Sequence, residues 1–186
     1  AYITGPKIKS LGLLESIGGN ADFRDSQVED MGSLRSIGGD AYITGPKIKS
    51  LGLLESIGGY ACFGGSQVED LGSLRSIGGS ANFKYSQIKR LGLLENIGGN
   101  ADFYDSQVED MGSLRSIGGD ADFGRSQVKS LGLLESIGGN ADFRDSQVED
   151  MGSLRSIGGD AYITGPKIKS LGLLESIGGY ACFGGS

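Results

Sequence analysis

The sequence repeats itself every 20 residues, and this period constrains the fold more than any other feature. Aligned in twenties, the 186 residues give nine units and six residues of a tenth. Each unit is close to A-x-F/I-x-x-S/P-x-V/I-x-x-L/M-G-x-L-x-x-I-G-G-x. Residues 21–66 and 141–186 are identical, so a second period of 120 residues lies above the first. Short regular repeats of this kind indicate a solenoid, in which each unit is one coil stacked on its neighbours.

Apolar and small residues within one unit predict the path of a coil. In the second unit the inward candidates are Ala21, Phe23, Ser26, Val28, Met31, Leu34 and Ile37. Their gaps are 2, 3, 2, 3, 3 and 3, then 4 to the next unit. A gap of 2 predicts an extended stretch, and gaps of 3 predict a turn-rich or 3₁₀-like return. We therefore expect each coil to hold one short strand near residues 20–24, a bend and a compact return segment.

Glycine and phenylalanine also keep fixed places in the unit. Ile-Gly-Gly ends every unit, where glycine permits a positive φ and a close approach of two backbones at a corner. All seven phenylalanines share one place, from Phe23 to Phe183, and Ile43 occupies it in another kind of coil. We expect these side chains to form one buried column along the stack.

The inward pattern resembles the leucine-rich repeat family, in the short form typical of bacterial repeats. The places of that family's motif correspond here to Gly18, Ala21, Phe23, Ser26, Val28, Met31 and Leu34 and their copies. The resemblance implies a short parallel strand in each coil and a ligand surface on the outward side of that strand. Three features depart from the family: Gly at its first Leu, Ser or Pro (Pro6, Pro46, Pro166) at its Asn, and the Ile-Gly-Gly ending.

Two alternatives stay open within the class of β-rich solenoids. "ADFRDSQVED" reads like two units of a pentapeptide-repeat β-helix, although "MGSLRSIGGD" breaks the five-residue beat. Another kind of β-solenoid is the third possibility. In each case residues 1–186 are expected to form a single solenoid, as part of a longer array.

Odd and even units differ systematically. Lys9-Ser10 becomes Glu29-Asp30 and then Lys49-Ser50, while Glu15 alternates with Arg35. In a stack with a spacing of ~4.8 Å, each charge would lie beside its opposite. The alternation predicts that the structural unit is a coil pair of 40 residues.

A leucine alternates with serine at the thirteenth place of the unit. The leucines are Leu13, Leu53, Leu93, Leu133 and Leu173. If they point outward, they form an apolar stripe for self-association with another solenoid. If the turn is loose, they tuck inward instead.

The remaining variation lies at the twentieth, second, fourth and fifth places, around the expected strand. Because Ala21 and Phe23 point inward, residues 20, 22 and 24 should point outward. The candidate ligand-binding residues are Tyr2, Asp22, Tyr42, Tyr60, Tyr85, Asp102, Tyr104, Asp122, Asp142, Tyr162 and Tyr180. Tyrosine offers contact area at low entropy cost, so this diversity indicates recognition. Relaxed constraint at solvent positions after duplication is the alternative.

No metal, cofactor or catalytic site is predicted. Asp102, Asp122 and Asp142 would stack on consecutive coils, but a flat column rarely converges the six or more oxygens that Ca²⁺ needs. The chain has no histidine and no nucleophile–base arrangement, so we expect no enzymatic activity. Two free thiols are expected, because Cys62 and Cys182 would lie six coils, or ~29 Å, apart.

Composition narrows the partners. The net charge of −6 and the absence of a Lys/Arg cluster argue against nucleic acid, and no apolar run is long enough to enter a membrane. Two function classes remain: a module for protein recognition or adhesion, and a structural protein that assembles end to end or laterally into fibres. The expected partners are therefore other copies of the chain or another protein, and the working hypothesis for location is extracellular or cell-surface.

Overall fold

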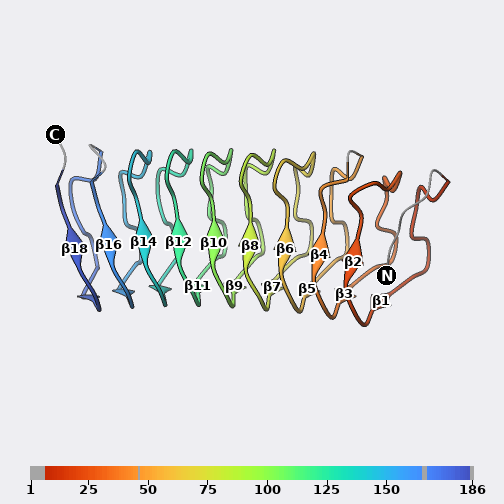
Figure 1. Ribbon diagram of the computed structural model, residues 1–186, viewed down its shortest axis with the longest axis horizontal. Helices are drawn as coiled ribbons and strands as arrows, with labels where there is room; N and C mark the ends of the chain where they lie inside the picture. Colours follow the sequence, from red (N-terminus) through yellow and green to blue (C-terminus); the bar gives the residue numbers. More distant parts are fainter. Residues whose placement is uncertain (1–6, 46, 165–166, 185–186) are drawn as a thin grey trace.

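The structure, a computed structural model, describes residues 7–45, 47–164 and 167–184. The described residues form a β-solenoid whose coils of 20 residues lie side by side along the long axis of the molecule (Figure 1). Tyr2, Pro6, Pro46 and Pro166 lie outside the described residues. Within those residues there is no helix long and apolar enough to cross a membrane.

Between residues 21 and 180, each coil contributes two strands of two residues, where one strand was predicted. One series is β1 (Ser16–Ile17), β3 (Ser36–Ile37), β5 (Ser56–Ile57), β7 (Ser76–Ile77), β9 (Asn96–Ile97), β11 (Ser116–Ile117), β13 (Ser136–Ile137), β15 (Ser156–Ile157) and β17 (Ser176–Ile177). The other is β2 (Ala21–Asp22), β4 (Ala41–Tyr42), β6 (Ala61–Cys62), β8 (Ala81–Asn82), β10 (Ala101–Asp102), β12 (Ala121–Asp122), β14 (Ala141–Asp142), β16 (Ala161–Tyr162) and β18 (Ala181–Cys182). The Ile-Gly-Gly corner therefore lies between two strands. Of the two predicted forms of the return segment, the turn-rich one is present and the 3₁₀-like one is not, since residues 7–45, 47–164 and 167–184 hold turns and no 3₁₀ segment.

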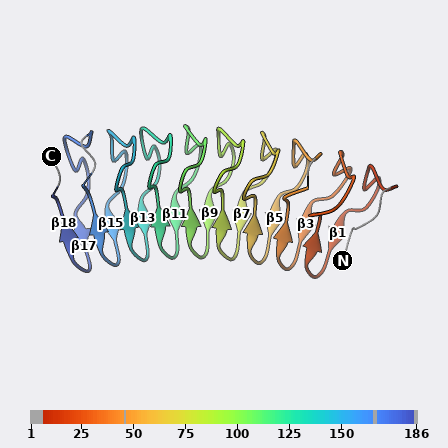
Figure 2. The same cartoon turned by 45° about the horizontal axis from the view of Figure 1, so that its top comes forward.

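In the described part of the chain, the two series form two parallel sheets of nine strands each. Figure 2 shows the β1–β17 sheet as one continuous row, and Figure 1 shows the β2–β18 row. Equivalent residues pair throughout, as in Ile17 with Ile37 and Ala21 with Ala41. The 20-residue period of the sequence is thus the hydrogen-bonding register of the stack.

The core fills the inside of the coil, and its composition confirms the inward pattern. Ala21, Phe23, Val28 and Leu34 are fully buried, as are their copies in the central coils. Inward places recur every five residues in the first half of a coil, as in Phe23 and Val28, but every three or four in the second half. The coil therefore shares only its first half with the beat of a pentapeptide-repeat helix.

The predicted phenylalanine column is present. Rings of consecutive coils from Phe63 to Phe143 stack with centroids 5.0 to 5.3 Å apart and interplanar angles of 1 to 15°. Towards the N-terminus the column continues through the buried Ile43 of the preceding coil to the buried Phe23 of the coil before that. At the last described coil Phe183 is 57% exposed, because no further described coil covers it. Parallel offset stacking adds to the apolar burial of these rings.

The Gly-Gly pair is needed for close approach and not for a positive φ. A Cβ on Gly38 would lie 2.4 Å from the carbonyl oxygen of Gly18, and the later coils repeat this contact at 2.1 to 2.3 Å. Positive φ occurs instead at the twelfth place, with 58° at Gly12 and 57° at Gly32. The expected left-handed corner at Ile-Gly-Gly is therefore wrong, and the left-handed turn lies at Gly12.

The corner at Gly12 confirms that coils associate in pairs. Within a pair, Ser33 N donates to the oxygen of Gly12 at 2.8 Å, and residues such as Ser10 and Asp30 form a parallel bridge. Among the described residues, no backbone hydrogen bond crosses from an even coil to the next odd coil at this corner. A Cβ on Gly52 would meet nothing within 4 Å, whereas one on Gly32 would meet Gly12. We call the even-to-odd boundary at this corner an open seam.

Side chains bridge the open seams. Four arginine–glutamate pairs run from an even coil to the next odd coil: Arg35–Glu55, Arg75–Glu95, Arg115–Glu135 and Arg155–Glu175, at 2.6 to 3.0 Å. These pairs are exposed, so each is worth about 0–1 kcal/mol. At the open seam between the coils 61–80 and 81–100 there is a cavity of about 430 Å³, lined by Gln67, Glu69, Gln87, Lys89 and Arg90. The alternating charges therefore align the coil pairs more than they stabilise them.

A column of buried serines has no side-chain partner. It comprises Ser26, Ser66, Ser86, Ser106, Ser126 and Ser146, whose Oγ atoms make no hydrogen bond within the described part of the chain. Their backbone N–H groups do bond, as Ser106 N donates to the oxygen of Phe103 at 3.1 Å. These serines therefore belong to a backbone turn and do not form a side-chain hydrogen-bond ladder.

Replacing one of these serines should not weaken the fold. A buried hydroxyl without a partner costs about 1–3 kcal/mol, so Ser106→Ala is expected to leave the free energy of unfolding unchanged or to raise it by about 1 kcal/mol. Urea denaturation of the full chain measures this difference. A loss larger than about 1 kcal/mol would show that the hydroxyl is satisfied.

Candidate functional site

The candidate site is the outer side of the β2–β18 sheet, which we call the strand face. It carries the second and fourth places of each coil, because the first and third places, such as Ala21 and Phe23, are buried. Of the predicted residues, Tyr42, Asp102, Asp122, Asp142 and Tyr162 lie on strands of this sheet and are half-buried. The sheet thus brings residues from coils far apart in sequence onto one continuous face.

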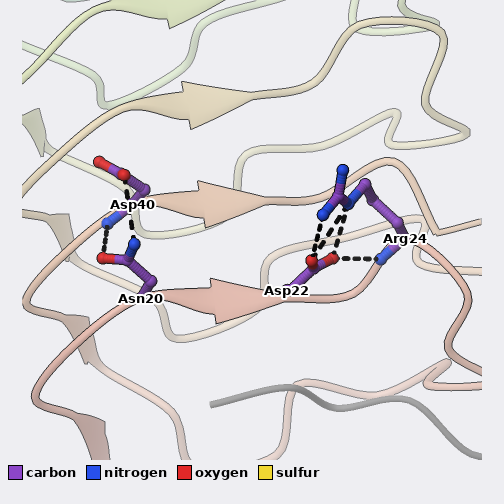
Figure 3. A network of polar contacts seen from close by, with 4 residues as sticks. All are labelled: Asn20, Asp22, Arg24 and Asp40. Atoms are coloured by element: carbon purple, nitrogen blue, oxygen red, sulfur yellow. Dashed lines mark hydrogen bonds and ion pairs between the residues drawn. The ribbon is translucent and has the colours of Figure 1, made fainter.

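Asp22 is buried, although the sequence predicts that it points outward into solvent. The residue is only 7% exposed, because the Arg24 side chain lies over it and bonds both carboxylate oxygens (Figure 3). The Arg24 guanidinium also lowers the pKa of Asp22 below its ordinary value. Asp142 and Arg144 make the same bidentate contact six coils on. These two carboxylates are therefore neutralised within the chain.

Most aspartates of the strand face shape a turn. The side-chain oxygen at the second place accepts the backbone N–H of the fourth place, as in Tyr104 N to Asp102 at 2.9 Å and Gly124 N to Asp122 at 2.8 Å. Asn82 does the same for Lys84. These bonds lead into a left-handed residue at the fifth place, such as Arg125 with φ 53°. The sequence signal was present, since Asp and Asn favour such turns, but we interpreted it as recognition.

Within residues 7–45, 47–164 and 167–184, the aspartate column does not form a group of three or more Asp, Glu or Cys side chains that could hold a metal ion. Asp102, Asp122 and Asp142 stand in register on adjacent strands. Burial raises the pKa of Asp122 above its ordinary value, and the neighbouring carboxylates add a smaller effect. No ion pair to Asp122 is formed by the described residues, whereas Asp142 is paired with Arg144.

Tyrosine rings on the strand face are packed by cationic side chains. Arg24 lies 4.9 Å from the ring centroid of Tyr42, and Arg144 lies 5.0 Å from that of Tyr162. Lys84 is 4.5 Å from the ring of Tyr104. Such contacts hold the rings in place at the surface.

Three further tyrosines complete the predicted set at the borders of the face. Tyr60 packs edge-on against Tyr42 with centroids 6.1 Å apart. Tyr85 and Tyr180 are 55% and 63% exposed. The described tyrosines therefore lie along the strand face and its two borders, as the sequence predicted.

Gly124 leaves a hollow in this face. The cavity measures about 240 Å³ and is lined by Tyr104, Asp122, Gly124, Arg125, Asp142, Arg144 and Asp145. It exists because neighbouring coils carry Tyr or Arg where this coil has no side chain, and a Cβ on Gly124 would lie 3.1 Å from the ring of Tyr104. The hollow combines an aromatic wall with charges of both signs.

The twentieth place has a structural role that the sequence reasoning missed. Asn20 Oδ1 accepts the N–H of Asp40 at 2.9 Å (Figure 3). Asp40 Oδ1 in turn accepts the N–H of Tyr60 at 2.8 Å. The same bond recurs from Ser80 to Asn100 and onward through the later coils, and we call this series the corner ladder. No such bond joins Tyr60 to Ser80 in the described chain, because a tyrosine side chain has no acceptor at that distance from its backbone. Asn, Asp and Ser at this place are therefore ladder residues.

The predicted self-association leucines lie away from the strand face and point outward. Leu13 is 90% exposed, and Leu53, Leu93, Leu133 and Leu173 are 43 to 51% exposed. The alternative in which they tuck inward is wrong, because the adjacent Leu54 and Leu94 already fill the core. Cys62 and Cys182 are free, as expected.

Comparisons with known proteins returned no match to a family model, to a curated protein or to a solved structure.

The corner ladder can be tested at Asn100. Asn100→Ala removes the acceptor for Asp120 N–H and should lower the free energy of unfolding by about 1 kcal/mol. Tyr180→Ala is the matched control, because Tyr180 is largely exposed and donates to the ladder only through its backbone; a change within about 0.5 kcal/mol is expected. Equal losses in urea denaturation would contradict the ladder role.

The raised pKa of Asp122 predicts an unusual pH dependence. A carboxyl whose folded pKa lies above its unfolded value of 3.8 binds its proton more tightly in the fold, so stability falls as pH rises through the folded pKa. Asp122→Asn keeps the turn, as Asn82 shows, and should be more stable than the parent chain at neutral pH. This advantage should vanish below pH 3.8.

Asp150→Asn is the control of opposite sign. Gly152 N–H and then the Ser130 hydroxyl lower the pKa of Asp150, so its charge stabilises the fold above pH 3.8 and that stability is lost on acidification. The variant should be less stable than the parent chain at neutral pH. If both variants shift in the same direction in urea titrations, the assignment of Asp122 is wrong.

Proposed function

We propose that this chain is a non-enzymatic scaffold that recognises another protein through the strand face. One observation carries the proposal: apart from the regular odd–even alternation, side-chain variation concentrates on the strand face and its borders, while the core places stay nearly constant from coil to coil. Places such as Leu34 and Ile37 hold the scaffold, and places such as Tyr42, Lys84 and Tyr104 differ between neighbouring coils. A constant core that carries a varied surface favours a role in binding over a role in catalysis.

The chemistry of the varied residues supports recognition. Tyrosine and arginine are enriched among the residues that dominate binding energy in protein interfaces. Tyr42, Tyr104 and Tyr162 are each braced by a cation within 5.0 Å, so little side-chain entropy is lost when a partner covers them. The hollow above Gly124 gives a partner side chain a place to enter.

We further propose kinship with leucine-rich repeat proteins. The buried Ala21, Phe23, Val28 and Leu34 at the family's motif places support it. The buried serines take the place of the asparagine ladder of that family, and the corner ladder at the twentieth place runs along the outside instead. Adhesion at a cell surface is the role that this kinship favours.

A triple variant tests recognition. Tyr42→Ser, Tyr104→Ser and Tyr162→Ser together should reduce partner capture at least tenfold, since each ring offers the area of an interface hot spot. Capture by the immobilised full chain, followed by quantitative mass spectrometry, measures the loss. Gln67→Ser, Gln107→Ser and Gln127→Ser together form the control, because these side chains are exposed outside the strand face. A partner that the tyrosine variant retains as well as the control does would refute the proposal.

Self-assembly is the second candidate function. The exposed leucines at the thirteenth place favour it, because they lie outside the core and away from the strand face.

A further inference from the structure

The leucines at the thirteenth place form a regular apolar edge, which we call the leucine ridge. Its members are Leu13, Leu53, Leu93, Leu133 and Leu173, and serines Ser33, Ser73, Ser113 and Ser153 lie between them. The four later leucines remain 43 to 51% exposed although a preceding coil covers part of each. Nine coils at ~4.8 Å make the ridge ~38 Å long. The core does not need these leucines, because the even coils carry serine at the same place and fold identically.

Two charged columns run beside the ridge on opposite arms of the turn at Gly12. The ninth-place column is Lys9, Glu29, Lys49, Glu69, Lys89, Glu109, Lys129, Glu149 and Lys169. The fifteenth-place column is Glu15, Arg35, Glu55, Arg75, Glu95, Arg115, Glu135, Arg155 and Glu175. Within every coil the two charges have opposite signs, and apart from the half-buried Glu95 all are exposed.

This arrangement is complementary to itself. A two-fold axis along the stack places the ridge of one copy on the ridge of another and exchanges the two arms. The ninth-place column of each copy then faces the fifteenth-place column of the other, coil by coil. Lys49 meets Glu55 of the second copy, and Glu69 meets Arg75. In the same register each leucine contacts the equivalent leucine of the second copy, so a single arrangement satisfies both the apolar and the charged contacts.

Other registers satisfy only part of the pattern. A slip of one coil sets leucine against serine and Lys49 against Arg35 or Arg75. In an antiparallel arrangement each column faces its own kind, so leucine-on-leucine contact brings lysine against lysine. Like charges across an interface suppress wrong registers.

We propose that the leucine ridge is an isologous interface at which a second copy of this chain binds side by side and parallel. The leucines supply apolar contact, and the two charged columns set direction and register. The intramolecular pairs such as Arg35–Glu55 hold the charges in position before contact. This interface is separate from the strand face, so a dimer would present two strand faces to partners.

Sedimentation of the full chain over a range of concentrations tests the interface. The parent chain should show a monomer–dimer equilibrium, and Leu53→Ser, Leu93→Ser and Leu133→Ser together should weaken it at least a hundredfold. Serine is the natural residue of the even coils at this place, and circular dichroism with urea denaturation checks that the variant folds. A parent chain that stays monomeric at every concentration, or a folded variant that dimerises as well as the parent, overturns the proposal. The strand-face tyrosine variant is the control and should dimerise normally.

Cross-linking tests direction and register. In a background with Cys62→Ala and Cys182→Ala, each of Leu53→Cys, Leu93→Cys and Leu133→Cys should form an intermolecular disulfide on mild oxidation. A parallel dimer in register brings each position against itself, whereas an antiparallel dimer can do so at one position at most. Cross-linking at one position or none overturns the parallel register. The leucine variant should still capture a partner through the strand face. The failure of the self-association proposal can therefore be told apart from the failure of the recognition proposal.

Discussion

The backbone hydrogen bonds between successive Ile-Gly-Gly corners are the interaction on which the rest of the structure depends. Gly38 N donates to the oxygen of Ile17 at 2.7 Å, and every later described coil repeats the bond at 2.8 Å. A Cβ at the first glycine of the corner would approach the previous coil to 2.1–2.4 Å, so no other residue allows this spacing. Because the corners are in register, the phenylalanines stack and the strand face becomes continuous. A coil alone orders 20 residues without covering its core, which is why only the stack is stable.

The pairing of coils follows from the corner at Gly12 and its copies. Every coil keeps glycine at the twelfth place for its positive φ, yet at this corner backbone bonds join the coils at alternate boundaries only, among the described residues. Where the boundary is open, Arg35–Glu55 and its copies span it with side chains. The odd–even alternation of charge in the sequence therefore corresponds to an alternation of backbone contact. Backbone bonds at the Gly12 corner thus join coils only within a pair, whereas at the fifteenth place both a backbone bond and the Arg35–Glu55 ion pair join one coil pair to the next.

How far the sequence predicted the structure depends on the kind of interaction. Inward places such as Phe23 and Leu34 follow from periodicity, which reports apolar burial directly, and the coil pair follows from the alternation of charge. The sequence left open whether Leu53 points outward or inward. The corner ladder through Asn20 and the burial of Asp22 were missed, because a side chain that bonds a backbone 20 residues away leaves no local pattern. From the sequence alone, an Asp or Asn at these places is equally compatible with facing solvent and with forming a turn. Only the position of the neighbouring coil distinguishes the two. The second strand was missed because two residues are too few for alternation to appear.

Around one coil, three surfaces carry different constraints. The side chain at the twentieth place accepts a backbone N–H where it is Asn, Asp or Ser, and a run of the ladder ends at Tyr60 and at Tyr180. The fourth place bonds only through its backbone in most coils, so Lys84, Tyr104 and Gly124 can follow one another without changing the turn. The thirteenth place accepts Leu or Ser with the same backbone. Since the strand face and the leucine ridge are separated by the core, a change on one surface leaves the other intact, and recognition and association can vary independently on one scaffold.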